Sequence, residues 1–152
     1  METVFENLKS FILETVNPAL EDYEDEEITL PKFEEKSIKF GVIDPVKNTA
    51  PLLCAIYPET VEESKDYISD DGQVFEYSVT ICVLLRGDTY DRLMKKICRY
   101  ADAIKESVYK NHSISGTCEN AKPGISRIYP DCGITEKQAV AVEMELTIIK
   151  EQ

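Results

Sequence analysis

The stretch from Gln73 to Lys110 constrains the fold more than any other part of the chain. Its first half alternates apolar with polar or small side chains, which is the period of a long strand with one buried face. The apolar positions are Phe75, Tyr77, Val79, Ile81, Val83 and Leu85, and the positions between them include Glu76, Ser78, Thr80 and Cys82. The strand is expected to end at Arg86-Gly87, where Asp88 can accept the free N–H groups at the start of a helix.

The second half of this stretch predicts a long helix from Asp88 to Lys110. Its apolar residues recur every three or four positions and form one stripe, made of Leu93, Met94, Ile97, Tyr100, Ala101, Ile104 and Val108. Such a stripe needs an apolar surface to lie on. We therefore expect the helix to pack on the strand before it, against Tyr77, Val79, Ile81 and Val83.

The remaining segments predict one short helix and several further strands. Residues 2–16 have the spacing of an amphipathic helix, and Asn17-Pro18 is expected to end it because proline pushes the preceding residue out of the α conformation. The other predicted strands are 38–43, 52–57, 114–120, 125–129 and 139–149, with a polar connection over 59–72. We predict a single domain over residues 1–152 of the α+β class, a mostly antiparallel sheet covered by one long helix and one short N-terminal helix.

The charge balance is strongly acidic. Seventeen Lys and Arg residues stand against 29 Asp and Glu residues, a formal net charge of −12, and no basic cluster interrupts this background. Because affinity for nucleic-acid phosphates comes mainly from Lys and Arg, free binding to nucleic acid is not expected. The chain shows no apolar run of membrane-spanning length and no signal-peptide layout, so we expect a soluble, cytosolic protein without a membrane partner.

Cysteine and histidine usage argues against a metal site, a cofactor and nucleophilic catalysis. The five cysteines are irregularly spaced with no C-x-x-C pair, which favours free thiols, three of them buried in strands and a helix. His112 is the single histidine, and no P-loop, G-x-S-x-G or G-x-G-x-x-G motif accompanies it. The tripeptide Arg86-Gly87-Asp88 is explained by the end of the strand, the turn and the helix cap. We expect no enzyme activity.

The most acidic segment, Glu21 to Glu27, contains six carboxylates and one tyrosine. We interpret it as a solvated loop. The alternative is a patch for a cation or a basic partner, but the glycine and the ligand spacing of a calcium loop are missing.

The order of these elements resembles the tail-terminator (tail completion) proteins of tailed bacteriophages. The elements that carry the resemblance are the short N-terminal helix, the apolar strand from Pro51 to Tyr57, the acidic loop, the strand Val74 to Leu85, the helix Asp88 to Lys110 and the last strand, Val140 to Ile149. Residues 17–48 are longer and more acidic than the family pattern.

The resemblance implies a structural virion protein without catalytic residues. Family members form a ring, usually a homohexamer, that caps the tail tube and joins it to the head. The implied partners are the tail tube protein, a neck or connector protein, and the tape-measure protein or sheath, with DNA passing through without specific binding. The implied location is the tail and neck of the virion, with the host cytoplasm during assembly.

Three other functions remain open at this point. The protein could be another neck or head–tail joining protein of the phage connector, a small cytosolic adaptor that docks through its acidic loops, or a small-molecule enzyme. For the last of these the sequence offers no convergent acid, base or nucleophile.

The polar faces of the two long strands suggest which residues would line a channel. Alternation places Glu76, Ser78 and Thr80 on the polar side of one strand and Glu143, Glu145 and Thr147 on the polar side of the other, and we expect the six together to form the surface that lines the channel. Carboxylates in a lumen repel phosphates, so DNA would pass without sticking. The alternative is an ordinary solvated sheet face, because alternation always leaves a polar side when the other side is buried.

Overall fold

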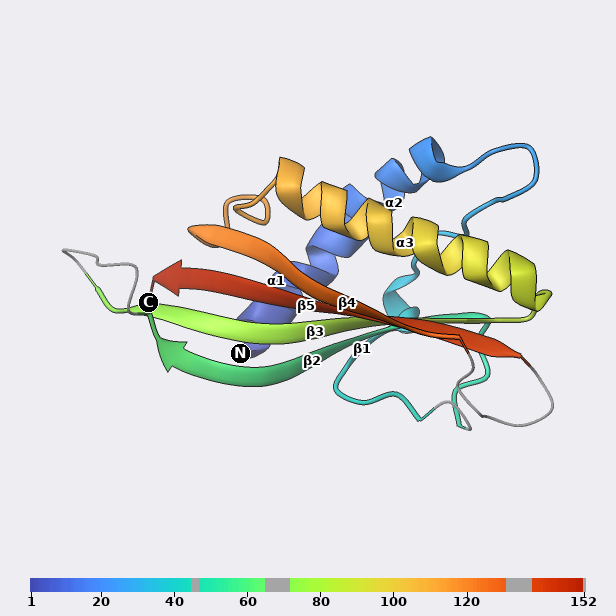
Figure 1. The fold of residues 1–152 in the computed structure, drawn as a ribbon. Coiled ribbons are helices and arrows are strands. Elements are labelled where there is room, and N and C mark those ends of the chain that lie inside the picture. Colours follow the sequence, from blue (N-terminus) through green and yellow to red (C-terminus); the bar gives the residue numbers. More distant parts are fainter. Residues whose placement is uncertain (45–46, 65–71, 131–137, 152) are drawn as a thin grey trace.

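The computed structural model describes residues 1–44, 47–64, 72–130 and 138–151. A five-stranded sheet in the order β1-β2-β3-β5-β4 forms one layer, and the helices lie together on one of its faces (Figure 1). The strands are β1 (Ile38–Phe40), β2 (Leu52–Glu63), β3 (Val74–Arg86), β4 (Asn120–Tyr129) and β5 (Ala139–Glu151). Only β1 and β2 pair in parallel, and the three other pairings are antiparallel. The predicted α+β class with a mostly antiparallel sheet is confirmed.

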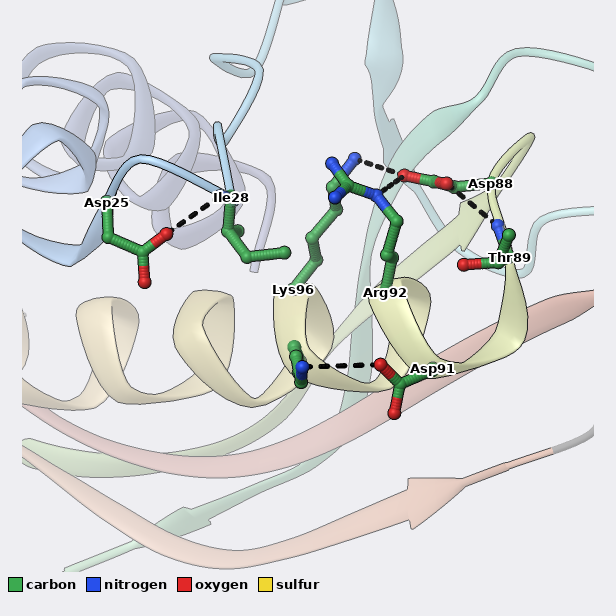
Figure 2. Close-up of polar contacts among 8 residues, drawn as sticks. Asp25, Ile28, Asp88, Thr89, Asp91, Arg92 and Lys96 are labelled. Carbon is green, nitrogen blue, oxygen red and sulfur yellow. Dashed lines mark hydrogen bonds and ion pairs between the residues drawn. The ribbon is translucent and has the colours of Figure 1, made fainter.

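The long helix α3 (Tyr90–Lys110) covers the sheet as its apolar stripe predicts. Its side chains Leu93, Ile97, Tyr100, Ile104 and Val108 are buried in the same core cluster as the alternate residues Tyr77, Val79, Ile81 and Val83 of β3. The start of the helix differs from the prediction. Thr89 is the N-cap residue, and the Asp88 carboxylate accepts the N–H of Thr89 at 2.8 Å and binds Lys96 and Arg92 instead (Figure 2).

The N-terminal helix does not end at Asn17-Pro18 as predicted. α1 (Glu2–Phe11) is followed by a π-helical turn, η1 (Ile12–Val16), then by α2 (Asn17–Ala19) and the 3₁₀ turn η2 (Leu20–Tyr23). Asn17 has α-helical dihedrals, φ −54° and ψ −49°, and its N–H bonds the carbonyl of Ile12 five residues back. The wider π turn shifts the hydrogen-bond ladder just before Pro18, which has no N–H to contribute.

The strand predicted over 52–57 does not stop at Pro58. β2 continues to Glu63, with a register shift between Pro58 and Thr60 where the extra residue is accommodated as a bulge. Pro58 is tolerated because it lies beyond the last residue paired with β1, on an edge where its missing N–H breaks no ladder. The predicted polar connection over 59–72 is therefore strand as far as Glu63, and its residues 65–71 lie outside the described residues.

Three other predicted boundaries are also wrong. β1 is shorter than the predicted strand 38–43. The predicted strand 114–120 is a series of turns in which Ile114 and Ser115 have positive φ of 48° and 59°, and the segment 120–129 forms one strand, β4. The gap between the predicted strands 114–120 and 125–129 is a bulge inside β4, where the pairing register shifts between Pro123 and Ser126. The last predicted strand is confirmed as β5, extended to Glu151.

The face of the sheet opposite the helices is only partly covered. A small apolar cluster of Leu53, Ala55, Cys82, Leu84 and Ala141 lies at one end of this face, with Ile43, Ala50 and Tyr57 packed against it. We call this side of the sheet the open face. Among the described residues, every helix is too short or too polar to span a bilayer.

Candidate functional surface

The six predicted channel-facing residues share the open face. β3 and β5 are antiparallel neighbours, and their register places Ser78 opposite Thr147 and Thr80 opposite Glu145. The third residue of each strand lies at an end of this double row, with Glu76 paired to Ile149 and Glu143 paired to Cys82. Alternation along each strand directs these side chains away from the helices, whose core takes up the residues between them.

Burial divides this row of six. Glu145 is exposed and Thr80 is 4% exposed, whereas the side chains of Glu76, Ser78, Glu143 and Thr147 are half-buried. The buried Thr80 hydroxyl donates a 2.7 Å hydrogen bond to Glu59 of β2. The Tyr129 hydroxyl of β4 donates to Glu143 at 3.2 Å.

Glu59 and Tyr129 therefore belong to the open face, although the sequence analysis did not assign them to it. Glu59 was missed because the predicted strand ended before Pro58, which left Glu59 in the predicted polar connection, whereas β2 continues to Glu63. Tyr129 was missed because its place beside β5 depends on the strand order, which the predicted strand 125–129 did not give.

Tyr57 marks the border between the polar and the apolar part of the open face. Burial raises the pKa of its hydroxyl above the ordinary value, and the neighbouring Cys82 and Glu143 raise it further. Glu76 and Glu145 lie level with Tyr57 or on the side of it away from the apolar cluster, whereas Glu143 lies beside Cys82 of that cluster.

The open face also carries two cations on its β4 edge. Lys122 pairs with Thr147 and Arg127 pairs with Glu143, so both residues align with the predicted row. Both side chains are exposed, and no ion pair to either is formed within the described residues. The open face is therefore acidic along β3 and β5 and basic along its β4 edge, which alternation within single strands did not predict.

Most side chains of the acidic segment 21–27 are exposed, as expected of a solvated loop, but the segment is also attached to the helices. Asp25 Oδ1 accepts the backbone N–H of Ile28 at 2.8 Å (Figure 2) and that of Glu27 at 2.9 Å. Asp25 Oδ2 binds the Arg99 guanidinium of α3 at 2.7 Å. These bonds, with that to Arg99 the strongest cause, lower the pKa of Asp25 to about 2. The segment is thereby attached to α3 on the helix side of the molecule, away from the open face.

The end of this acidic segment and the residues that follow it form a strap over the helices, which we define as residues 24–33. Ile28, Leu30 and Phe33 are buried in the main core. The Tyr100 hydroxyl of α3 donates to the Pro31 carbonyl, and Glu24 accepts the N–H of Leu30 at 2.8 Å. Acidic composition alone predicted a loop, because the partners that hold the strap are far away in the sequence.

The residues considered for chemistry are dispersed. His112 is exposed beyond the end of α3, and Arg86 donates to the carbonyls of Ala50 and Asn48, so the tripeptide Arg86-Gly87-Asp88 serves the turn into the helix. Its Gly87 has φ +89°, which favours glycine. Within the described parts of the chain, no group of His, Cys, Asp and Glu has the arrangement of metal ligands.

The described cysteines are free thiols, but their burial differs from the prediction. Cys54 and Cys82 are buried in strands as expected, whereas Cys98 of α3 is exposed because it lies on the solvent side of the apolar stripe. Cys118 is partly buried, and Cys132 lies outside the described residues. Burial raises the pKa of the Cys118 thiol to about 11.

Two comparisons with known proteins found no match. No protein-family model matches the chain, and no curated protein is significantly similar to it.

Proposed function

We propose that this protein is a ring-forming tail terminator, a structural protein that caps a phage tail tube and joins it to the head. The observation that carries the proposal is the open face. A sheet with all described helices on one side presents a double row of carboxylates and hydroxyls on the other side. Such a two-sided subunit suits a ring whose helices lie outside and whose sheet lies inside.

The charge of the chain supports a role as a DNA conduit. The formal net charge is −12, and Glu76, Glu143 and Glu145 add carboxylates to the face that would form the lumen. Duplex DNA carries a high density of negative charge, so carboxylates weaken its adhesion and leave it free to pass. The cations Lys122 and Arg127 lie on the edge strand β4, at the margin of that face.

The ring is tested with purified protein and uncapped phage tail tubes. We expect a ring of usually six copies by light scattering and electron microscopy, located at one end of each tube, and elongation of the capped tubes should stop. A protein that stays monomeric and leaves tube elongation unchanged would overturn the proposed function.

The channel assignment is tested with two charge reversals of equal size. Glu145→Lys changes an exposed residue of the open face, and Glu27→Lys changes an exposed residue on the helix side. We expect the assembled Glu145→Lys ring to retain duplex DNA with a steep salt dependence, whereas the Glu27→Lys ring behaves as wild type. Equal retention by both rings would place the open face outside the lumen.

A further inference from the structure

The sheet has two edges on which, among the described residues, no further strand is paired. β4 forms one edge along its whole length. On the other side, β1 covers β2 only from Cys54 to Ile56, so residues 57–63 of β2 form a second edge (Figure 1). Unpaired strand edges present backbone N–H and C=O groups that can add another strand.

These two edges carry opposite charges on the same face. β4 contains Lys122 and Arg127 and no carboxylate, whereas residues 57–63 contain three glutamates and no cation. The register places Lys122 and Arg127 on the open face, opposite Thr147 and Glu143. Glu62 shares that face because it pairs with Glu76, and Glu59 reaches it through its bond to Thr80.

The order of the charges also matches. Lys122 and Arg127 are level with Thr147 and Glu143, four residues apart on β5, which is about 13 Å at the rise of a strand. Glu62 is level with Glu76, whereas Glu59 lies in the bulge between Pro58 and Thr60 and its carboxylate reaches the Thr80 hydroxyl. In an antiparallel pair, the order from Lys122 to Arg127 along β4 runs beside the order from Glu62 to Glu59 along β2.

We propose that β4 of one copy pairs with the 57–63 edge of β2 in a second copy, with Lys122 beside Glu62 and Arg127 beside Glu59. Three antiparallel pairings separate β2 from β4, so these strands run in opposite directions in one copy. In a ring whose copies all point their strands the same way, β4 of one copy therefore runs antiparallel to β2 of the next copy. The edge contact joins one copy to the next, and that the joined copies close into a ring rests on the proposed function.

Exposed apolar side chains support a protein partner at both edges. Ile128 of β4 is 41% exposed and Val61 of β2 is 48% exposed, and their pairings place both on the helix side of the sheet. Pairing of the two edges removes the side chains of Ile128 and Val61 from water on the helix side. The cations of β4 and the glutamates of β2 then meet on the open face. The two edges are different surfaces, so the contact is head-to-tail, the type that generates rings.

Charge reversal gives a sharp test, because two variants that repel themselves should attract each other. The acidic variant, Lys122→Glu with Arg127→Glu, has two acidic edges, and the basic variant, Glu59→Lys with Glu62→Lys, has two basic edges. We expect each variant alone to be monomeric where wild type assembles. Their equimolar mixture should assemble into rings that contain equal numbers of both, as measured by native mass spectrometry with and without tail tubes.

Controls separate the edge contact from folding and from net charge. Lys36→Glu with Lys47→Glu makes the same charge change at exposed positions away from β4 and should assemble as wild type. Circular dichroism verifies that each variant is folded. If loss of the Glu59 bond to Thr80 unfolds the basic variant, Glu62→Lys alone replaces it in the mixture.

Two results would overturn the inference in distinguishable ways. Variants that form rings as wild type does, or a mixture that stays monomeric, would reject the edge contact while the wild-type ring still supports the proposed function. A wild-type protein that forms no ring with or without tubes would reject both.

Discussion

Replacement of Asn17 by alanine should show how the N-terminal helices are attached to the rest of the core. Asn17 is 8% exposed, and its amide makes two hydrogen bonds to the backbone of Phe33. Nδ2 donates to the Phe33 carbonyl and Oδ1 accepts the Phe33 N–H, both at 2.8 Å. One side chain therefore satisfies both backbone groups of a residue in the strap.

The cost of Asn17→Ala follows from those two groups. A buried backbone donor or acceptor left without a partner costs about 1–3 kcal/mol, so the two together give about 2–6 kcal/mol. We expect about 3 kcal/mol, because the space left by the amide is polar and can admit a water molecule that restores part of the bonding. For a chain of this length that corresponds to a fall in Tm of about 6–12 °C.

Urea unfolding followed by circular dichroism measures this change, and a lower midpoint with an unchanged slope identifies a loss of stability. The control is Asn48→Ala, which removes an amide whose bond to the Asp44 carbonyl is exposed, and it should change the free energy of unfolding by less than about 0.5 kcal/mol. Hydrogen exchange at the Phe33 amide should accelerate in Asn17→Ala alone.

Asn17→Asp separates hydrogen bonding from packing. When protonated, the introduced carboxyl group can donate to the Phe33 carbonyl as the amide does, whereas the ionised form places a carboxylate against that carbonyl. Burial raises the folded-state pKa of such a carboxyl, so the stability relative to wild type should be retained at low pH and lost as the pH rises through that pKa. A loss in Asn17→Ala no larger than in Asn48→Ala, or no pH dependence in Asn17→Asp, would refute the reasoning.

Three further outcomes test the core, the strap and the thiols. Ile97→Ala removes a fully buried side chain and should lower the free energy of unfolding by about 2–5 kcal/mol, whereas Cys98→Ala, one residue on and exposed, should have little effect; equal Tm values would contradict the core assignment. Arg99→Gln removes the main cause of the low pKa of Asp25, so NMR titration should show that pKa rising from about 2 toward its ordinary value; the stabilisation from this pair is present above about pH 4 and is lost as the pH falls through about 2. Under native conditions a thiol reagent should modify Cys98 quickly and the buried Cys54 only on unfolding, and elemental analysis should find no stoichiometric zinc.

Periodicity was sufficient to predict the centre of the fold. The two-residue period from Phe75 to Leu85 and the three-to-four-residue spacing from Leu93 to Val108 are local properties, and each identifies the buried side of its element without reference to any other. The same alternation in β5 was enough to predict that Glu143, Glu145 and Thr147 lie on one polar face. That this face and the face of Glu76 form one surface was a hypothesis that alternation alone could not establish, because strand order depends on the whole sheet.

Errors arose where a residue's conformation depends on partners distant in sequence. Pro18 reads as a helix stop, yet Asn17 stays helical because a π turn precedes it and its side chain is held by Phe33, sixteen residues away. The acidic segment is largely exposed as its composition predicts, but composition could not predict that Arg99 holds Asp25 across 74 residues.

The sequence by itself determined which residues of the long strands and the long helix are buried, because those periods arise within a single element. Only the tertiary structure decided the candidate surface. The bulges at Pro58 and Pro123 decide which way Glu62 and Arg127 face, and the strand order decides that their charges lie on opposite edges of one sheet. Such a bulge reverses the facing of every residue after it, and its formation depends on the partner strand as much as on the local residues.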